Sequence, residues 1–253
     1  MIFDTHTHIY LPEFNEDCEA VVQRAKEAGV AMMMLPNVDA DTIVSLKEVN
    51  SRYSECTIAA MGLHPTSVGE DYKRQLQQIF QEFEQKEYHA VGEVGIDLYW
   101  DKTYRAQQIE VFTEQLRWAK EKSLPVIIHN REAFADTIAS LKESPVDRFV
   151  MHSFGGSPED VKRVREVGDA YFGINGVVTF KNAKLEDTIK EIGIERLVVE
   201  TDAPYLSPVP YRGKRNEPSY IVNTINKIAE ILSLSSEEVE RVTYNNSCTL
   251  FSV

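Results

Sequence analysis

Short apolar runs alternate along the chain with longer stretches of mixed polar and apolar residues. Several runs, such as AMMML, PVII and RLVV, are apolar throughout rather than alternating. A run of this kind is typical of a parallel β-strand with both faces covered. Eight strands are predicted, at residues 2–8, 30–37, 57–64, 90–97, 125–129, 148–153, 170–175 and 196–201.

The stretches between these runs predict helices. Gly29, Gly168 and Gly193 each follow such a stretch, where a glycine commonly ends a helix. Ser157 and Pro158 supply a cap residue and a first-turn proline for another. The predicted helices are 15–28, 40–53, 70–87, 104–123, 131–142, 158–167 and 183–192, followed after the last strand by 218–232 and 235–246.

Eightfold alternation of strand and helix predicts an α/β fold, a (β/α)8 barrel of the TIM type formed by one domain over residues 1–253. A doubly wound open sheet is the alternative. That fold needs a glycine-rich phosphate turn after the first strand, and the sequence there, HTHIYLPEF, has no glycine. The barrel is therefore favoured.

Composition narrows the class of protein. Hydrophobic residues make up 43% of the 253 positions, which excludes intrinsic disorder. No stretch approaches the ~20 apolar residues of a membrane span, and the opening MIFDTHTHIY lacks the features of a secretory signal. Three scattered cysteines make no disulfide framework. We expect a cytoplasmic protein that has no membrane association and no obligate protein partner.

The net charge of −13 repels polyanions at long range and argues against a protein that coats DNA. It leaves room for a small cationic pocket, because salt confines such fields to about 10 Å.

Chemistry gathers at the carboxyl ends of the predicted strands. Five of the six histidines lie there, and two carboxylates belong to the same group: His6, His8, His64, His129, His152, Glu93 and Asp202. In a barrel these ends converge on one face, which is where active sites of this fold lie.

A metal site is the favoured interpretation of this group. His6 and His8 are two residues apart and therefore point to the same side of a strand. Imidazoles and carboxylates together suit Zn, Mn, Fe, Co or Ni better than calcium. Six ligands (His6, His8, Glu93, His129, His152 and Asp202) exceed the need of one tetrahedral ion, so two divalent metals that share a carboxylate are predicted.

The roles of two members stay open on this evidence. His64 either supports a ligand or contacts substrate, and Asp202 either caps the following segment or acts as a ligand or base. His89 precedes a strand and is interpreted as structural.

A second group of residues is basic. Arg131 follows His129 by two residues, and Arg212, Lys214 and Arg215 lie in the loop after the eighth strand. Loops in this part of the fold often hold phosphate, and guanidinium groups match phosphate oxygens in pairs. Arg131 and Arg215 are the predicted phosphate contacts; the alternative is a solvated loop with scattered charges.

Motifs over nearly the whole chain resemble those of the TatD family of metal-dependent deoxyribonucleases, within the amidohydrolase-like barrels. They occur in the order DTHTH, GLHP, GEVGIDLYW, PVIIHNRE, MHSFGGS, ETDAPYL, RNEP and NNSCTLF. The chain departs from the usual pattern at Ser153 and Val94, where cysteines are common, and at Thr66, where a histidine is common. The first two changes leave the ligands intact, whereas Thr66 bears on the substrate side.

The resemblance implies a barrel that holds two divalent metals, with Zn, Mn, Mg, Co and Ni as candidates. By similarity, His6, His8 and Asp202 hold one metal, His129 and His152 hold the other, and Glu93 bridges them. The lysine that bridges metals in many amidohydrolases has no counterpart on the fourth strand.

The resemblance implies hydrolysis of DNA phosphodiester bonds by a 3′-to-5′ exonuclease, and a deep barrel mouth favours single-stranded ends as its substrate. Asp202 and Glu93 are the catalytic carboxylates, with Asp202 orienting water and taking its proton, and His64, Arg131 and Arg215 contact substrate. One alternative is a metal-dependent amidohydrolase acting on a small amide or ester. A non-catalytic barrel that binds a nucleic-acid end or a protein is the other.

Overall fold

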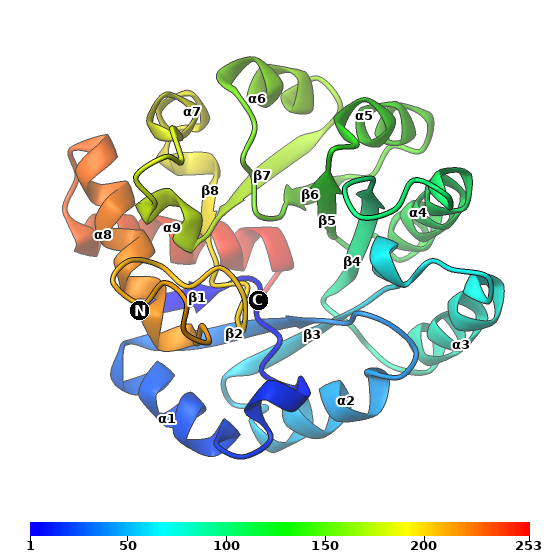
Figure 1. The fold of residues 1–253 in the computed structure, drawn as a ribbon, viewed down its shortest axis with the longest axis horizontal. Coiled ribbons are helices and arrows are strands. Elements are labelled where there is room, and N and C mark those ends of the chain that lie inside the picture. The colour runs from blue at the N-terminus through cyan, green and yellow to red at the C-terminus, as the bar shows by residue number, and fades with distance from the viewer.

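A computed structural model describes all 253 residues as an eight-stranded parallel barrel surrounded by helices (Figure 1). Strand order follows the sequence, from β1 to β8. The strands are β1 (Ile2–Asp4), β2 (Val30–Pro36), β3 (Thr57–Met61), β4 (Ala90–Asp97), β5 (Val126–Arg131), β6 (Arg148–Met151), β7 (Asp169–Ile174) and β8 (Leu197–Val199). Hydrogen bonding of Thr5 to Val199 (3.0 Å) and a parallel bridge between Thr7 and Ala203 close the barrel. The predicted fold is confirmed.

The helices are α1 (Cys18–Glu27), α2 (Ile43–Arg52), α3 (Tyr72–Gln85), α4 (Arg105–Lys122), α5 (Phe134–Glu143), α6 (Pro158–Arg165), α7 (Glu186–Ile192), α8 (Ile221–Leu232) and α9 (Ser236–Phe251). Helices α1 to α8 surround the barrel, and α9 packs across one end of it. A 3-10 turn lies between strand and helix after β1, β3, β7 and β8. Short 3-10 turns lie at Pro12–Phe14, Pro65–Ser67, Gly176–Thr179, Ile194–Arg196 and Pro218–Tyr220. The last of these falls at the start of the predicted helix 218–232, and the sequence pattern did not predict the others. No helix combines the length and the apolar character needed to cross a membrane.

Local signals in the sequence set several helix boundaries. Ser157 and Asp160 form a reciprocal capping box at the start of α6, with Pro158 in the first turn. Gly29 follows α1 with a φ of 88°, a left-handed conformation that favours glycine.

Other boundaries differ from the prediction. α9 continues to Phe251 rather than ending at 246, because its last turn packs inside the barrel, where the Phe251 ring lies 5.7 Å from that of Phe3. The strands at 2–8, 57–64 and 196–201 end earlier than predicted, and the polar residues after them lie in connecting segments.

The barrel interior has an apolar lower layer and a polar upper one. The lower layer is a buried cluster with members from all eight strands and from α9: Phe3, Met34, Ile58, Ala60, Ala90, Ile127, Val150, Tyr171, Val198, Leu250 and Phe251. Two residues beyond Ile127, Val150 and Val198, and on the same side, come His129 in β5 and, directly after β6 and β8, His152 and Glu200. Strand periodicity therefore stacks the polar group directly on the sealed apolar layer.

Candidate metal centre

The segment after β1 places two histidines at the centre of the mouth. His6 and His8 are buried, and backbone hydrogen bonds hold this segment on both sides: Thr7 donates to Met34 at 3.1 Å and His8 to Ala203 at 2.8 Å. Their Nε2 atoms lie 3.0 Å apart. Because both flanking segments fix the backbone, the two imidazoles converge without depending on a flexible loop.

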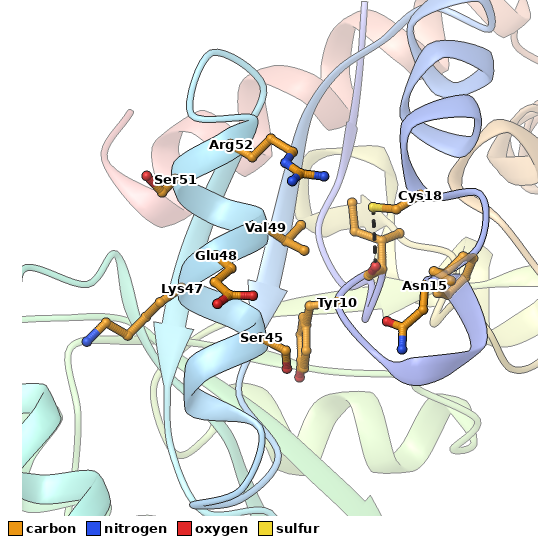
Figure 2. A pocket seen from close by; sticks show the side chains of 11 residues that line it. Tyr10, Asn15, Cys18, Ser45, Lys47, Glu48, Val49, Ser51 and Arg52 are labelled. Atoms are coloured by element: carbon orange, nitrogen blue, oxygen red, sulfur yellow. Dashed lines mark hydrogen bonds between the residues drawn. The ribbon is translucent and has the colours of Figure 1, made fainter.

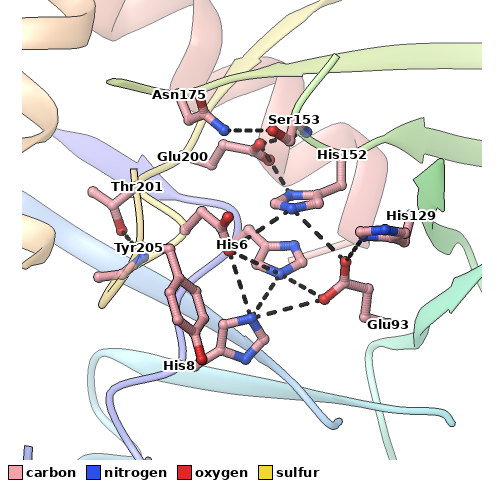
Figure 3. A network of polar contacts seen from close by, with 12 residues as sticks. His6, His8, Glu93, His129, His152, Ser153, Asn175, Glu200, Thr201 and Tyr205 are labelled. Atoms are coloured by element: carbon pink, nitrogen blue, oxygen red, sulfur yellow. Dashed lines mark hydrogen bonds and ion pairs between the residues drawn. The ribbon is translucent and has the colours of Figure 1, made fainter. Parts of the chain in front are cut away.

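Glu93 on β4 presents one carboxylate oxygen to each half of the site (Figure 3). Its Oε2 lies 3.1 Å from His6 Nε2 and 3.7 Å from His8 Nε2. Its Oε1 lies 3.0 Å from His129 Nδ1 and 3.7 Å from His152 Nε2. Buried to 3% exposure, this carboxylate divides the histidines into two pairs.

Asp202, after β8, reaches both pairs from the opposite side. Its Oδ1 lies 3.7 Å from His8 Nε2, 3.9 Å from His6 Nε2 and 3.8 Å from His152 Nε2. With 14% of its side chain exposed, against 4% for Glu93, it is the carboxylate nearer to solvent. The structure thus brings together all six residues predicted as ligands.

In His8 and His129, the ring nitrogen that points away from the cavity hydrogen-bonds to a neighbouring residue. These hydrogen bonds fix where the proton of each neutral imidazole lies, and so which nitrogen presents a lone pair to the cavity. The Tyr10 hydroxyl donates to the Pro36 carbonyl, so it accepts from His8 Nδ1 (3.0 Å) and leaves the Nε2 of a neutral His8 unprotonated. Likewise, Asp97 Oδ2 lies 2.9 Å from His129 Nε2 and accepts its proton, which turns the Nδ1 lone pair toward Glu93. These partners orient the rings as a metal ligand requires.

Glu200 has the same position behind His152. Its Oε1 lies 3.0 Å from His152 Nδ1 and accepts a 2.6 Å hydrogen bond from the Ser153 amide. The neighbouring strand leaves room for it: a Cβ added at Gly173 would lie 2.3 Å from Glu200 Oε2. His152 Nε2 is left to face Glu93 and Asp202.

His64 differs from the other cavity histidines. Its Nδ1 accepts a hydrogen bond from the Thr66 backbone N–H at 3.2 Å, so the proton of the neutral ring lies on Nε2. That Nε2 lies 3.5 Å from Glu93 Oε1. His64 therefore presents a donor to the cavity rather than a lone pair, which favours a contact with substrate over metal ligation.

The donor set fits divalent cations. Donor atoms around tetrahedral zinc lie about 3.4 Å apart, because each bond is about 2.1 Å long. In this cavity, the imidazole nitrogens lie 3.0 to 3.9 Å from one another or from the oxygens of Glu93 and Asp202. Lone pairs of His8 and His129 face carboxylate oxygens, an arrangement that repels unless a cation or a proton lies between them. Two buried groups, His6–His152–Asp202 and His6–His8–Glu93, and one partly exposed group, His64–Glu93–His129, bring His, Glu and Asp donors close enough to hold metal ions. In the third group the Nε2 proton of His64 leaves Glu93 and His129 as the donors.

The pKa values of the cavity follow from burial and from these neighbours. Burial raises the pKa of Asp202 to about 7 and lowers the pKa of His8 to about 4. Burial also acts to raise the pKa of Glu93, but the surrounding histidines outweigh it and hold that pKa well below its usual range. Burial opposes the charge on His152, yet Glu200 and the cavity carboxylates raise its pKa to about 10. The acids therefore draw positive charge, as metal or proton, into the centre.

Of the two predicted phosphate contacts, Arg131 lines the metal cavity and Arg215 does not. Arg131, at the end of β5, lines the cavity of about 630 Å³ that five of the six candidate ligands also line, and it is the only lysine or arginine to do so. Arg215 does not line it, because its guanidinium is held by Asp17 at 2.7 and 2.8 Å and stacks on Phe14. Arg212 lies over the Phe180 ring, also outside the cavity. Direct phosphate contact by Arg215 is therefore withdrawn, since an ion pair already engages this guanidinium.

Three supporting residues, Asp97, Glu200 and Tyr10, had no role assigned from the sequence. The first two carried a usable signal, because each is an acid near the carboxyl end of an apolar strand. Tyr10 continues the alternation of His6 and His8, which also points to the same side.

A larger cavity, of about 830 Å³, lies outside the barrel between the segment after β1 and α2 (Figure 2). Tyr10, Cys18, Lys47, Glu48 and Arg52 are among its lining residues. It contains no histidine and only one carboxylate, so the chemistry lies in the smaller cavity.

Comparison with known proteins agrees with this geometry. A family model described as TatD related DNase matches residues 3–252. The chain is 38% identical to the uncharacterized metal-dependent hydrolase YabD of Bacillus subtilis, with both chains covered completely. It is 32% identical to the uncharacterized metal-dependent hydrolase YjjV of Escherichia coli K12, over 99% of this chain and 97% of that protein. The crystal structure of YjjV, described as a TatD homologue, superimposes with a TM-score of 0.92 and covers 100% of this chain and 98% of that one.

Proposed function

Because the chain belongs to the TatD-related DNase family and is a metal-dependent hydrolase, we propose that it cleaves phosphodiester bonds of DNA, from the 3′ end of single strands. The observation that carries the proposal is the cavity wall, in which five of the six candidate ligands adjoin one unpaired guanidinium, that of Arg131. A phosphodiester carries the single negative charge that such a group recognises.

One divalent metal would be held by His6, His8 and Asp202, and the other by His129 and His152. Glu93 would contribute to both sites. When bound, the metals supply Lewis acidity to a phosphoryl oxygen and lower the pKa of water. Their charge also offsets that of Glu93, Asp97 and Asp202, which would otherwise repel a phosphate.

Asp202 is positioned to accept the proton of the attacking water. It is the more exposed of the two central carboxylates, and an ionised carboxylate beside the bound water can take its proton. His64 Nε2–H, which faces the cavity, would donate to an oxygen of the substrate. Arg131 would hold a non-bridging phosphate oxygen, which fixes the distance between phosphorus and the water.

The mouth favours strand ends. The ligands lie at the bottom of a cavity walled by the loops after the strands, and duplex DNA is wider than a single strand. Nothing in the fold resembles a helix that reads base edges in a groove, so we expect little sequence preference.

The test is digestion of single- and double-stranded DNA labelled at the 3′ or 5′ end, against a panel of divalent cations. Stepwise shortening of single strands from the 3′ end, with competitive inhibition by inorganic phosphate, supports the proposal. Metal-dependent hydrolysis of small amides or esters, indifferent to phosphate and without DNA cleavage, would replace it with the amidohydrolase alternative.

A further inference from the structure

An exposed aromatic pair borders the metal cavity. Tyr99 and Trp100 lie two and three residues after the end of β4, and they are 48% and 71% exposed. Trp100 lines the same cavity as Glu93 and His129. The other tryptophan, Trp118, is only 4% exposed and packs against Phe80 and Phe83. The chain therefore buries one indole and leaves the second in water at the mouth of the site.

The unpaired guanidinium of the cavity belongs to the same cluster. Arg131 Cζ lies 3.8 Å from the centre of the Tyr99 ring and 5.4 Å from that of Trp100. The two rings are perpendicular to each other, with centres 4.8 Å apart. Stacking on Tyr99 holds one face of the guanidinium, while its N–H groups make no hydrogen bond within the chain. Tyr99 thus orients Arg131 and leaves its donors free for an anion.

We infer that Trp100 is a stacking platform for an unpaired nucleobase of the substrate, whose phosphate is bound by Arg131. This inference rests on the proposed phosphodiesterase activity, since it assigns the part of the substrate that lies beside the phosphate in the same cavity. An indole and a guanidinium 5.4 Å apart match the two parts of one nucleotide, a flat ring and an anion.

The chemistry of the platform selects the substrate class. Every base has a flat face, so stacking on an aromatic ring tolerates any sequence. A base inside a duplex is covered by neighbours on both faces, whereas a base in a single strand can leave the stack. Trp100 therefore favours single-stranded nucleic acid, and a small phosphodiester without a ring gains nothing from it.

A second exposed ring stands across the mouth. Tyr205, after β8, is 51% exposed, lines the same cavity and lies beside His8 with ring centres 6.5 Å apart (Figure 3). It limits the entrance on the β8 side, whereas Trp100 and Arg131 border the β4–β5 side. The base that we assign to Trp100 is thus on the far side of the metal ligands from Tyr205.

Tryptophan fluorescence tests binding directly. The metal-loaded protein is mixed with single-stranded oligonucleotides in a stopped-flow instrument and observed before the first turnover. We expect quenching of Trp100 by an ordinary strand and little quenching by a strand whose 3′-terminal positions are abasic. The Trp100→Phe variant retains only Trp118, which is buried, and should show no quenching with either strand.

Kinetics with the same two strands separates stacking from a structural effect. Base–aromatic stacking contributes enough that Trp100→Ala should raise KM for the ordinary strand by about 5- to 150-fold, with little change in kcat. Abasic ends should raise KM of the wild type by a similar factor and should make the variant and the wild type equivalent. Trp100→Phe should recover most of the affinity, and Val44→Ala, which trims a 65% exposed side chain on α2, should change nothing.

The outcomes are distinct. An equal loss by Trp100→Ala on ordinary and abasic strands, or no loss on either, would overturn the platform. Base-dependent quenching of a strand that is never cleaved would support the platform and reject the proposed phosphodiester hydrolysis.

Discussion

Two clusters of charged side chains flank the segment that follows β8, and they are neutralised in opposite ways. On its outer side, Arg24 binds Glu217 at 2.6 and 2.7 Å, and Arg215 binds Asp17 at 2.7 and 2.8 Å. These four residues are called the outer ion-pair cluster below. Each carboxylate in it lies against a guanidinium, so its charges are satisfied by the chain itself.

In the metal cavity, the charges and lone pairs converge on one another instead. Glu93 and Asp202 face imidazole nitrogens at 3.0 to 3.9 Å, and the only guanidinium, Arg131, pairs with neither. The difference teaches how to interpret charged residues in this fold. Arg215 and Arg131 looked alike in sequence, and only their partners separate an arginine that stabilises from one that is free to bind.

The largest expected effect is loss of activity on Glu93→Gln. The variant keeps the shape of the side chain but removes the charge shared by both halves of the site. Hydrolysis should fall about 10³-fold or more, since the metals are asked to supply several kcal/mol of the barrier reduction. Metal content by mass spectrometry and kcat/KM are the measurements. Glu217→Gln in the outer ion-pair cluster is the matched control and should retain normal metal content and normal kcat/KM. Near-normal hydrolysis by Glu93→Gln would show that this carboxylate is not needed for the reaction.

Removal of the metals should lower stability. A ligand present at 100 to 1,000 times its Kd stabilises the folded state by about 3–4 kcal/mol, and here it also relieves the repulsion among Glu93, Asp202 and the imidazole lone pairs. Urea unfolding with and without a chelator measures this difference. Superimposable curves for the wild type would show that the cavity tolerates its charges unaided. Glu93→Gln should respond far less to the chelator.

Two arginine substitutions sharpen the contrast further. Arg131→Ala should lower kcat/KM on DNA by about 10- to 100-fold, because it removes a charge-assisted contact, without changing metal content. Arg215→Ala should leave kcat/KM within about twofold and lower the free energy of unfolding by about 1 kcal/mol, as expected for a half-exposed ion pair. The reverse pattern would mean that the phosphate contact has been assigned to the wrong arginine.

The smallest effect concerns acid stability. Burial acts to raise the pKa of Glu217, but Arg24 and Ser219 outweigh it and hold the pKa below its usual range. A depressed carboxyl pKa stabilises the fold above the unfolded value of about 4.5 and loses that contribution as pH falls through the folded value. Wild-type stability should therefore decline by about 1 kcal/mol more than that of Glu217→Gln between pH 6 and pH 3. Parallel pH profiles in urea unfolding would contradict this.

The barrel could be predicted from the sequence because each element carried its own local signal. The bounds of β4 agree with the prediction at both ends, and the start of α6 was visible in Ser157 and Pro158. The last turn of α9 could not be predicted, since Leu250 and Phe251 pack against strand residues such as Phe3 that are remote in sequence.

The candidate ligands could be predicted for a related reason. Strand ends in a barrel converge whatever the details, so His129 and His152 meet once the fold is known. The loops do not obey such a rule. The position of Arg215 depends on Asp17, almost 200 residues away, and the role of Trp100 depends on how Arg131 stacks on its neighbour. Pairings of this kind are absent from any local pattern.

Gly173 has no functional group, yet it supports the candidate metal centre through the space that it leaves free. Any side chain at that position on β7 would displace the Glu200 carboxylate, which lies 3.0 Å from His152 Nδ1. Mutational scans of this barrel should accordingly find an intolerant position where a map of functional groups shows an empty space. A search for remote relatives should therefore require a glycine at this position as well as the histidines of the site.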